Sequence, residues 1–547
     1  MDVPITVNNG LLPKIDDTKP VGDENHILVP FYPADLRRHA GVIVGDDVRT
    51  LFEYARDNKF AIPAINVTST STIIAALEAA QNAKAPIILQ VSSGGAEFLG
   101  GKGINKGPEE LLKTSQEVMI RGSIGAANFI RSVAPYYGIP VVLHTDHCKL
   151  EDLPWLDGLL EANIEHNAAY QGRVRGLKTY REELLKKTQA ELQSSKDDRV
   201  LQKKVLAIQE SIKAVQEEIN AGLKEPLFSS HMIDLSVSSN EVNIKETKER
   251  LKKSKEAGTW LEMEIGITGG EEDGVNNENA DRKKLYTNPA DIWEVYDSLQ
   301  EVSTNFSIAA AFGNVHGLYK PGAVKLRPWL LGKHQKYVKA KLQNSNGDIP
   351  GAIVPDEPDD MNPEEVDTNE DPETKNPVFL VFHGGSGSAK EEFLTGIQHG
   401  VVKVNIDTDT QFTYTKPVRD WMVTHADRLE SPVGTKADPN DTQPNKGKFD
   451  PRKWLREAEV SMSNRVQQAL REFNAAGKWT VQRVTLEKYA EFMRERANLM
   501  EKRAKLAEER VKLAGERAKL TMEPRAKLAR ERADLIEKRA KLAEERA

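Results

Sequence analysis

Three histidines each lie at or near the end of a separate strand-like run and are followed by turn-forming residues: His147, His316 and His383. Neutral imidazoles that converge from strand ends make a metal site with an open coordination position. Three such ligands suit zinc and leave a fourth position for a substrate. His144 is the alternative ligand in the first run, but it precedes Asp146 by two residues and therefore shares that residue's face of the strand.

Carboxylates accompany these histidines. Asp146 stands directly beside His147, and the run Trp260–Gly266 carries Glu264 before an acidic, glycine-flanked loop that contains Glu272. A carboxyl group whose pKa is raised by burial can donate or accept a proton at neutral pH. The simpler alternative for the loop is a solvent-exposed acidic turn.

A possible phosphate site follows the third histidine. Residues 384–387 read Gly-Gly-Ser-Gly, which leaves backbone N–H groups able to converge on an anion, and a helix is predicted just after them. Residues 405–408, Asn-Ile-Asp-Thr, close the next strand. Phosphate sites after strands seven and eight recur in barrel enzymes. Metal, base and phosphate site together indicate a metal-dependent enzyme that acts on a phosphorylated sugar.

The elements that must position these residues are eight strand-like runs separated by helical patterns. The runs are Phe60–Val67, Pro86–Ser92, Pro140–His147, Leu227–Ser236, Trp260–Gly266, Phe306–Gly317, Pro377–Gly387 and Val401–Asp409. Several are almost continuously apolar, as strands covered on both faces are. Eight alternations predict an α/β fold of the (β/α)8 TIM barrel type. A doubly wound open sheet is the main alternative, but the number of strands and the polar residues at strand ends favour the barrel.

Composition narrows the function classes. The chain has 547 residues and a formal net charge of −7, which argues against a nucleic-acid binder. One cysteine, Cys148, cannot form an internal disulfide and indicates a reducing compartment. No apolar stretch reaches the ~18 residues that a membrane span needs. The acidic amino-terminal residues disfavour a targeting signal, so we expect a cytoplasmic enzyme.

Several segments are expected to lie outside the catalytic barrel of residues 41–475. Residues 1–40 are predicted to be an irregular amino-terminal extension. Residues 168–223 predict an inserted helical hairpin that is interrupted near Ser194–Asp198. Residues 343–375, rich in Asp, Glu and Pro, predict a disordered acidic loop. Residues 487–547 predict a long charged helix with heptad repeats.

The heptad tail has two interpretations. Leu506, Leu513 and Leu520 are seven residues apart, as a coiled coil requires. However, the position three residues before each of these leucines is arginine, so the apolar stripe is narrow. The tail is either a solvated single helix, interrupted at Pro524, or a weak coiled coil that self-associates or binds an unknown partner.

Six motifs in order resemble class II fructose-bisphosphate aldolases, and more narrowly the longer, dimeric class IIA branch. They are VVLHTDHC, LFSSHMIDLS, TGGEEDG, FGNVHG, FHGGSG and VNIDTDT, beginning at residues 141, 227, 268, 312, 382 and 404. The resemblance runs from about residue 41 to residue 473, apart from the helical hairpin and the acidic loop.

The resemblance implies a role for each matched residue. The catalytic zinc would be held by His147, His316 and His383, and a second or alternative metal position would be lined by Asp234 and Glu264. The catalytic residues would be Asp146, Glu272 and Asn405. Substrate would contact Asn66, Ser92, Gly317, Gly384, Gly385, Ser386, Asp407, Thr408 and, from a neighbouring subunit, Arg452. A monovalent cation, K⁺ or Na⁺, near the phosphate loop and a homodimer formed through the barrel are also implied.

The implied activity is a glycolytic lyase reaction, the reversible cleavage of fructose 1,6-bisphosphate into dihydroxyacetone phosphate and glyceraldehyde 3-phosphate. A tagatose bisphosphate aldolase is one alternative. A scaffold or assembly protein built on an aldolase barrel is another, from a different class. A class I aldolase would need a Schiff-base lysine. Lys403 shares the face of Asn405, but the zinc ligands make it unnecessary.

Overall fold

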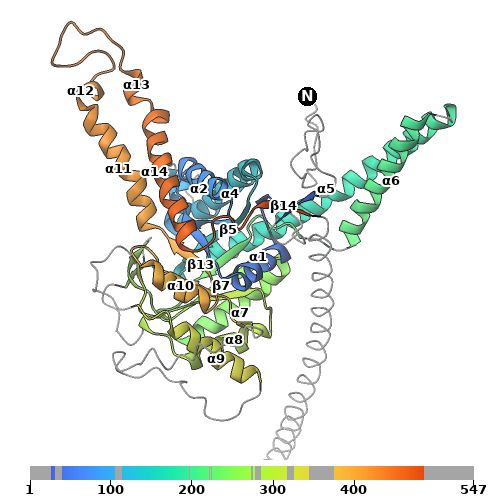
Figure 1. Ribbon diagram of the computed structural model, residues 1–547, viewed down its shortest axis with the longest axis horizontal. Coiled ribbons are helices and arrows are strands. Elements are labelled where there is room, and N and C mark those ends of the chain that lie inside the picture. The colour runs from blue at the N-terminus through green and yellow to red at the C-terminus, as the bar shows by residue number, and fades with distance from the viewer. Residues whose placement is uncertain are drawn as a thin grey trace, which may run out of the picture. The chain divides into compact units, whose positions relative to one another are not determined.

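A closed barrel of eight parallel strands lies within the larger of two compact units, the one that contains Phe31–Thr480 (Figure 1). The computed structural model describes residues 26–30, 40–104, 114–195, 198–220, 222, 224–272, 275–277, 285–316, 326–343 and 375–485, without the side chains of residues 26–30, 270–277, 316 and 481–485. In order around the barrel, the strands are β3 (Ile62–Asn66), β4 (Ile87–Ser92), β5 (Pro140–Asp146), β6 (Ser230–Ile233), β7 (Trp260–Ile265), β10 (Phe306–Ala310), β12 (Leu380–Phe382) and β13 (Val401–Ile406). Pairing of β13 with β3 closes the barrel, so the predicted TIM barrel is confirmed.

The barrel strands are buried along their whole length because helices cover their outer faces. A short strand, β2 (Gly41–Val42), pairs with β5 beside the barrel. The covering helices include α1 (Asp46–Asp57), α2 (Thr70–Ala83), α4 (Ser115–Val133), α7 (Asn240–Ala257), α8 (Pro289–Gln300), α9 (Leu330–Leu342), α10 (Lys390–Gln398) and α14 (Pro451–Glu472). Side-chain caps mark several starts, such as Ser69, which accepts the backbone N–H of Thr72 at the start of α2.

Strand register brings the polar residues to one end of the barrel. Ser92 on β4 lies opposite Asp146 on β5, and Glu264 on β7 lies opposite Ala309 on β10. Since all eight strands are parallel, their carboxyl ends meet at the same mouth. Residues from distant parts of the sequence are therefore gathered there.

The predicted sixth strand is shorter than expected. The run Phe306–Gly317 divides into β10 and β11 (Val315–His316), which leaves the barrel and pairs with β8 (Gly269–Glu272). The division falls where Gly313 adopts a φ of +89° and Asn314 Oδ1 accepts the backbone N–H of Phe312. A left-handed glycine and a side chain that bonds its own turn end the extended conformation. A third strand, β9 (Val275–Asn277), pairs antiparallel with β8.

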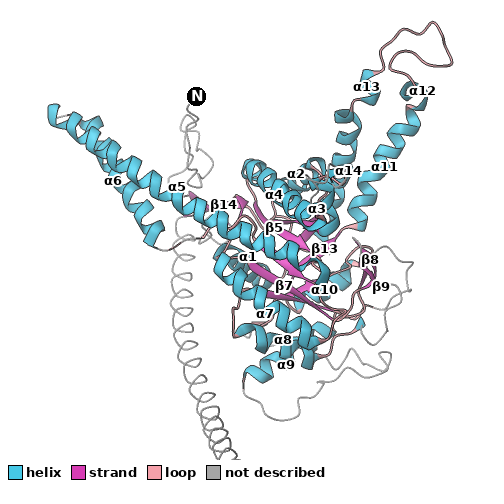
Figure 2. Cartoon of the chain, turned by 180° about the vertical axis from the view of Figure 1, so that it is seen from behind, coloured by secondary structure: helices cyan, strands magenta, loops and turns pink. Residues whose placement is uncertain are grey.

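A long helical hairpin extends from the barrel. Helix α5 (Leu153–Ser194) covers the barrel with its first half, and its second half pairs with α6 (Arg199–Asn220) (Figure 2). The two helices bury a narrow seam whose residues recur at three-, seven- and fourteen-residue spacings and so return to one helix face: Val174, Thr188, Val205, Ile208 and Val215. The remaining faces are charged or exposed.

A second projection follows the last barrel strand. Helix α11 (Thr408–Thr424) leads through α12 (Ala426–Leu429) and α13 (Lys446–Phe449) to α14, which returns to pack against α2 (Figure 1). Only Thr410 of α11 is buried, whereas Phe412 and Val423 are exposed. This arm therefore leaves apolar side chains in contact with solvent.

A separate unit contains a two-stranded antiparallel sheet of β1 (His26–Pro30) and β14 (Val481–Thr485). Within the amino-terminal extension, which was expected to be mostly irregular, the apolar run Ile27–Val29 pairs as part of strand β1. Apart from residues 343 and 375, the expected acidic loop lies outside the described residues, as does the heptad tail. Among the helices that the structure describes, none has the length and apolar character to cross a membrane.

Candidate metal and catalytic centre

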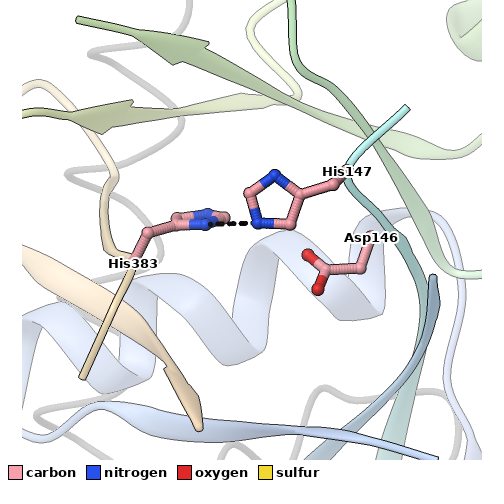
Figure 3. A group of neighbouring side chains, drawn as sticks. All are labelled: Asp146, His147 and His383. Carbon is pink, nitrogen blue, oxygen red and sulfur yellow. Dashed lines mark hydrogen bonds between the residues drawn. The ribbon is translucent and has the colours of Figure 1, made fainter. Parts of the chain in front are cut away.

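Two of the three predicted histidine ligands meet at the barrel mouth. His147 follows β5 and His383 follows β12, and His147 Nε2 lies 3.2 Å from His383 Nδ1 (Figure 3). Asp146 stands beside them, and all three side chains are buried. The two histidines are 236 positions apart in the sequence. Barrel closure, not local structure, therefore brings them together.

The spacing of these nitrogens fits a shared metal ion. Two ligands at about 2.0–2.1 Å from a tetrahedral zinc lie about 3.3 Å apart, close to the 3.2 Å between His147 Nε2 and His383 Nδ1. Glu264 adds a buried Oε2 atom that makes no hydrogen bond with the described residues. That oxygen lies 3.7 Å from His147 Nδ1 and 3.8 Å from His383 Nδ1. Imidazole and carboxylate donors in this number suit a divalent cation.

His147 combines an unusual backbone conformation with a bonded imidazole. Its φ of +39° lies in the left-handed region that non-glycine residues rarely occupy, which is typical of functional sites. Its Nδ1 lies 3.0 Å from Asp234 Oδ2, and Ser236 Oγ donates to the other Asp234 oxygen. Burial alone would raise the pKa of Asp234, but the hydrogen bond with His147 lowers that pKa below its ordinary value. Asp234 is thus a carboxylate that orients the imidazole.

Glu264 lies in a different electrostatic environment. Burial, and then the nearby charge of Asp234, raise the pKa of Glu264 to about 8. Thr268 Oγ1 donates a hydrogen bond of 2.8 Å to Glu264 Oε1. The nearby imidazole of His147 lowers this pKa but does not offset burial, and a bound divalent ion would favour the ionised carboxylate further.

Asp146 is held by three side-chain amides. Gln90 Nε2 donates to Asp146 Oδ2 at 2.9 Å, and Asn66 Nδ2 donates to the same oxygen at 3.1 Å. Asn405 Nδ2 donates to the other oxygen, Oδ1, at 3.2 Å and lies 3.2 Å from His383 Nδ1. A carboxylate with both oxygens bonded keeps one orientation beside the metal position. Gln90 was not among the predicted residues, although it lies two before Ser92 in the same strand.

A buried ion pair lies against His383. Glu262 Oε1 is 2.8 Å from His383 Nε2 and 2.8 Å from Lys403 Nζ. Sequence reasoning missed Glu262, although its position two residues before Glu264 places both on the inner face of β7. His144, the alternative ligand, instead bonds Ser230 Oγ through Nδ1 at 2.7 Å.

The predicted phosphate residues form a turn beside the start of α11. Gly384 and Gly387 have φ values of +63° and +84°, and a Cβ atom on Gly385 would lie 2.8 Å from Asn405 O. Ser386 Oγ accepts the backbone N–H of Asp409 in the first turn of α11. Thr408 is the first residue of that helix, and Asp407, just before it, accepts a hydrogen bond from Gln411. A glycine turn beside a helix amino terminus is suited to an anion.

The other predicted residues lie in different surroundings. Ser92 is buried and caps α3 (Ser93–Gly100) by accepting the backbone N–H of Gly95. Arg452 is exposed in the first turn of α14, where its guanidinium pairs with Asp450. The side chains of His316 and Glu272, and the whole of Gly317, lie outside the described residues.

A parallel eight-stranded barrel with converging imidazoles, a bonded carboxylate and a glycine turn at its mouth defines a metal-dependent barrel enzyme. A sequence model of the family "Fructose-bisphosphate aldolase class-II" matches residues 46–165 and 204–478. The chain belongs to the class II fructose-bisphosphate aldolase family, which confirms the resemblance of the six motifs. The gap between the matched ranges falls within the α5–α6 hairpin.

Individual relatives support the same family. The chain is 46% identical to "Fructose-bisphosphate aldolase" of Neurospora crassa over 81% of this chain and 98% of the relative. It is 46% identical to the protein of the same name from Saccharomyces cerevisiae, over 80% of this chain and 97% of the relative. Among solved structures, fructose-bisphosphate aldolase from Campylobacter jejuni matches with a TM-score of 0.56 and 35% identity, over 80% of this chain and 97% of that chain.

Proposed function

We propose that this protein catalyses the reversible aldol cleavage of fructose 1,6-bisphosphate to dihydroxyacetone phosphate and glyceraldehyde 3-phosphate. One observation carries the proposal: His147 and His383 face each other at 3.2 Å beside a bonded Asp146. They do so in a chain that is 46% identical to aldolases along almost their whole length.

The catalytic metal is zinc in this proposal, held by His147, His316 and His383. Cleavage of a carbon–carbon bond next to a ketone leaves negative charge on the ketone oxygen. A bound zinc ion supplies the Lewis acid that stabilises this charge. Asp234 and Glu264 would line a second divalent position, and a monovalent cation would lie near the glycine turn.

Asp146 carries the proton in this proposal. In the cleavage direction its carboxylate accepts the proton of the C4 hydroxyl while the C3–C4 bond breaks and the aldehyde forms. In the condensation direction it returns that proton to the aldehyde oxygen. The amides of Gln90, Asn66 and Asn405 keep the carboxylate facing the reacting carbon atoms.

The remaining residues bind the two halves of the sugar. Glu272 would exchange a proton with the three-carbon ketone fragment, beside Asn405. The phosphate of that fragment would be bound by Gly317, Gly384, Gly385, Ser386, Asp407 and Thr408. Asn66 and Ser92 would lie near the aldehyde half. The glycine turn supports this assignment, because its backbone lies against the amino terminus of α11.

A homodimer is part of the proposal. Arg452 is exposed and pairs only with Asp450, two residues before it, among the described residues. The arm that carries it also leaves Phe412 and Val423 exposed. An arginine and apolar side chains presented to solvent suit a subunit interface in which Arg452 reaches the neighbour's phosphate. The cytoplasm is the proposed location.

Steady-state kinetics with the two bisphosphates test the substrate. We expect kcat/KM for fructose 1,6-bisphosphate to exceed that for tagatose 1,6-bisphosphate, which differs in configuration at C4. Equal values would defeat the preference for fructose 1,6-bisphosphate, and reversed values would favour the tagatose enzyme. Absence of turnover with either sugar would favour the scaffold alternative.

A further inference from the structure

A buried ion pair lies one layer below the candidate metal centre, inside the barrel. Glu262 on β7 and Lys403 on β13 each lie two residues before a residue of the site, Glu264 and Asn405, and so share their inward face. Lys403 Nζ is 2.8 Å from Glu262 Oε1, and both side chains are 2% exposed. Strands β10 and β12 separate β7 from β13 in the barrel, so the pair crosses the interior.

The same carboxylate oxygen also fixes the tautomer of His383. Lys403 can only donate, so Glu262 Oε1 accepts from Lys403 and from His383 Nε2, each at 2.8 Å. His383 must then carry its proton on Nε2. In the neutral imidazole that binds zinc, the other ring nitrogen, Nδ1, then carries the lone pair, and this nitrogen faces His147 Nε2 (Figure 3). Zinc requires this unprotonated nitrogen.

We propose that Lys403 and Glu262 are positioning residues for the zinc ligand His383. The inference rests on the proposed function, because it assumes that His383 binds zinc. Lys403 fixes the Glu262 carboxylate, and Glu262 fixes the tautomer and the angle of the imidazole. Hydrogen bonds of this kind to a metal-bound histidine raise its affinity for the metal.

The lysine is needed because the carboxylate is buried. A buried carboxylate without a cationic partner is strongly disfavoured. Glu262 Oε2 also lies 4.0 Å from His144 Nε2, a buried nitrogen that makes no hydrogen bond with the described residues. Without Lys403, the carboxylate can rotate toward His144, and His383 loses its fixed acceptor.

This position also separates Lys403 from Schiff-base chemistry. Its amine is bonded to Glu262 and its side chain is 2% exposed, so a substrate carbonyl has no approach to it in this arrangement. The position of Lys403, two residues before Asn405, is therefore better explained by its bond to Glu262, the partner of His383, than by a role as a nucleophile.

Two variants of the full chain, Glu262→Gln and Lys403→Met, test the proposal. The readouts are zinc transfer to a chelator of known affinity and the visible spectrum of the cobalt-substituted protein. Glu262→Gln leaves His383 only a neutral acceptor, and Lys403→Met removes the cation that fixes the Glu262 carboxylate. We therefore expect zinc to bind roughly 10–100-fold more weakly in both variants, the usual effect of mutating such a partner. The cobalt spectrum should change as well, because the orientation of one ligand changes.

The matched control is Glu225→Gln, which breaks another poorly exposed ion pair. Arg131 Nη1 lies 2.9 Å from Glu225 Oε1, on the segment that enters β6 at the opposite end of the barrel from the site. This variant should unfold at a lower temperature but bind zinc as the unmodified protein does. An equal loss of zinc affinity in the control would assign the effect to general destabilisation and overturn the proposal.

Unchanged zinc affinity and cobalt spectrum in folded Glu262→Gln or Lys403→Met would also overturn it. If neither single variant folds, the double variant, which leaves no buried charge unpaired, replaces them. Zinc held as tightly by the double variant as by the unmodified protein would contradict the proposal. An unmodified protein that binds no zinc and cleaves no fructose 1,6-bisphosphate would instead defeat the proposed function itself.

Discussion

The barrel mouth and the α5–α6 hairpin are built by contacts of opposite kinds. At the mouth, Asn405 donates to Asp146 across 259 positions of sequence, and His383 meets His147 across 236. In the hairpin, two consecutive helices bury a seam of residues that return to one helix face, such as Val205, Ile208 and Val215. The family sequence model continues on both sides of residues 166–203 but does not match them. A local, repeating element can therefore be inserted without disturbing a site that depends on distant residues meeting.

The largest effect should come from removing one imidazole from the mouth. In His383→Ala, kcat/KM should fall by at least about 10³-fold, because metal stabilisation of developing charge contributes several kcal/mol. A coupled assay for cleavage of fructose 1,6-bisphosphate measures it. His334→Asn is the control, since His334 is a buried histidine that bonds Thr287 O instead. Activity within tenfold of the unmodified protein would contradict the assignment of His383.

Replacing the proton carrier, Asp146, should reduce activity less than His383→Ala does and should leave zinc binding unchanged. Asp146→Asn keeps the shape of the side chain but cannot accept the C4 proton, so we expect kcat to fall by about 10²–10⁴-fold. Bound zinc, measured by metal analysis, should stay within about twofold of one ion per chain. Loss of zinc together with activity would show that Asp146 acts as a metal ligand.

The contact between the first half of α5 and strand β6 should become less stable at acidic pH. His231 on β6 bonds Thr145 Oγ1 through Nδ1 and Asn163 of α5 through Nε2, and burial lowers the pKa of His231 to about 3. Its unfolded pKa is about 6.5, so the unfolded chain binds a proton that the folded protein excludes. The free energy of unfolding should therefore fall as pH falls from about 6.5 toward 3.

Urea unfolding at several pH values measures this term. Replacing His231 by Gln should reduce the slope between about pH 5.5 and 4 by one proton, or about 1.4 kcal/mol per pH unit. The difference in slope between the unmodified protein and the variant should not depend on the metal centre, because His231 faces α5. An unchanged slope in the variant would mean that His231 is protonated in the folded protein.

Removing the hairpin itself should have the smallest effect on activity. Residues 173–216 can be replaced by a short Gly-Ser turn, since Tyr170 and Glu218 contact each other at the base. The root contacts of Asn163 and Asn167 with the barrel remain. We expect kcat/KM within about twofold of the full chain, because no described residue of the mouth lies in the hairpin. A fall of tenfold or more in the folded variant would show that the hairpin acts on the site.

The sequence predicted most of the barrel, because each strand is an apolar run bounded by turn residues, as in Pro140–His147. It also placed His147 and His383 at strand ends that meet. It did not predict Gln90, Glu262 or the break at Gly313. Gln90 and Glu262 were missed because the stagger of the strands decides which side chains share one layer of a barrel. The break at Gly313 was missed because a turn closed by a hydrogen bond to Asn314 leaves no periodic pattern in the sequence.

The strand β1 was missed for a related reason. Its five residues pair with Val481–Thr485, more than 400 positions away. A short apolar run in a polar segment indicates a strand only when its partner is known. Local patterns therefore predicted the scaffold, whereas contacts between distant residues had to come from the structure.

Stoichiometric zinc titration coupled to aldol cleavage tests the central claim most directly. Protein stripped by a chelator should lose its turnover of fructose 1,6-bisphosphate and regain it linearly until one zinc ion per chain is bound. Borohydride added with substrate should have no effect on the zinc-loaded enzyme. Turnover that survives complete removal of metal and is abolished by borohydride would contradict the account and point to a lysine nucleophile.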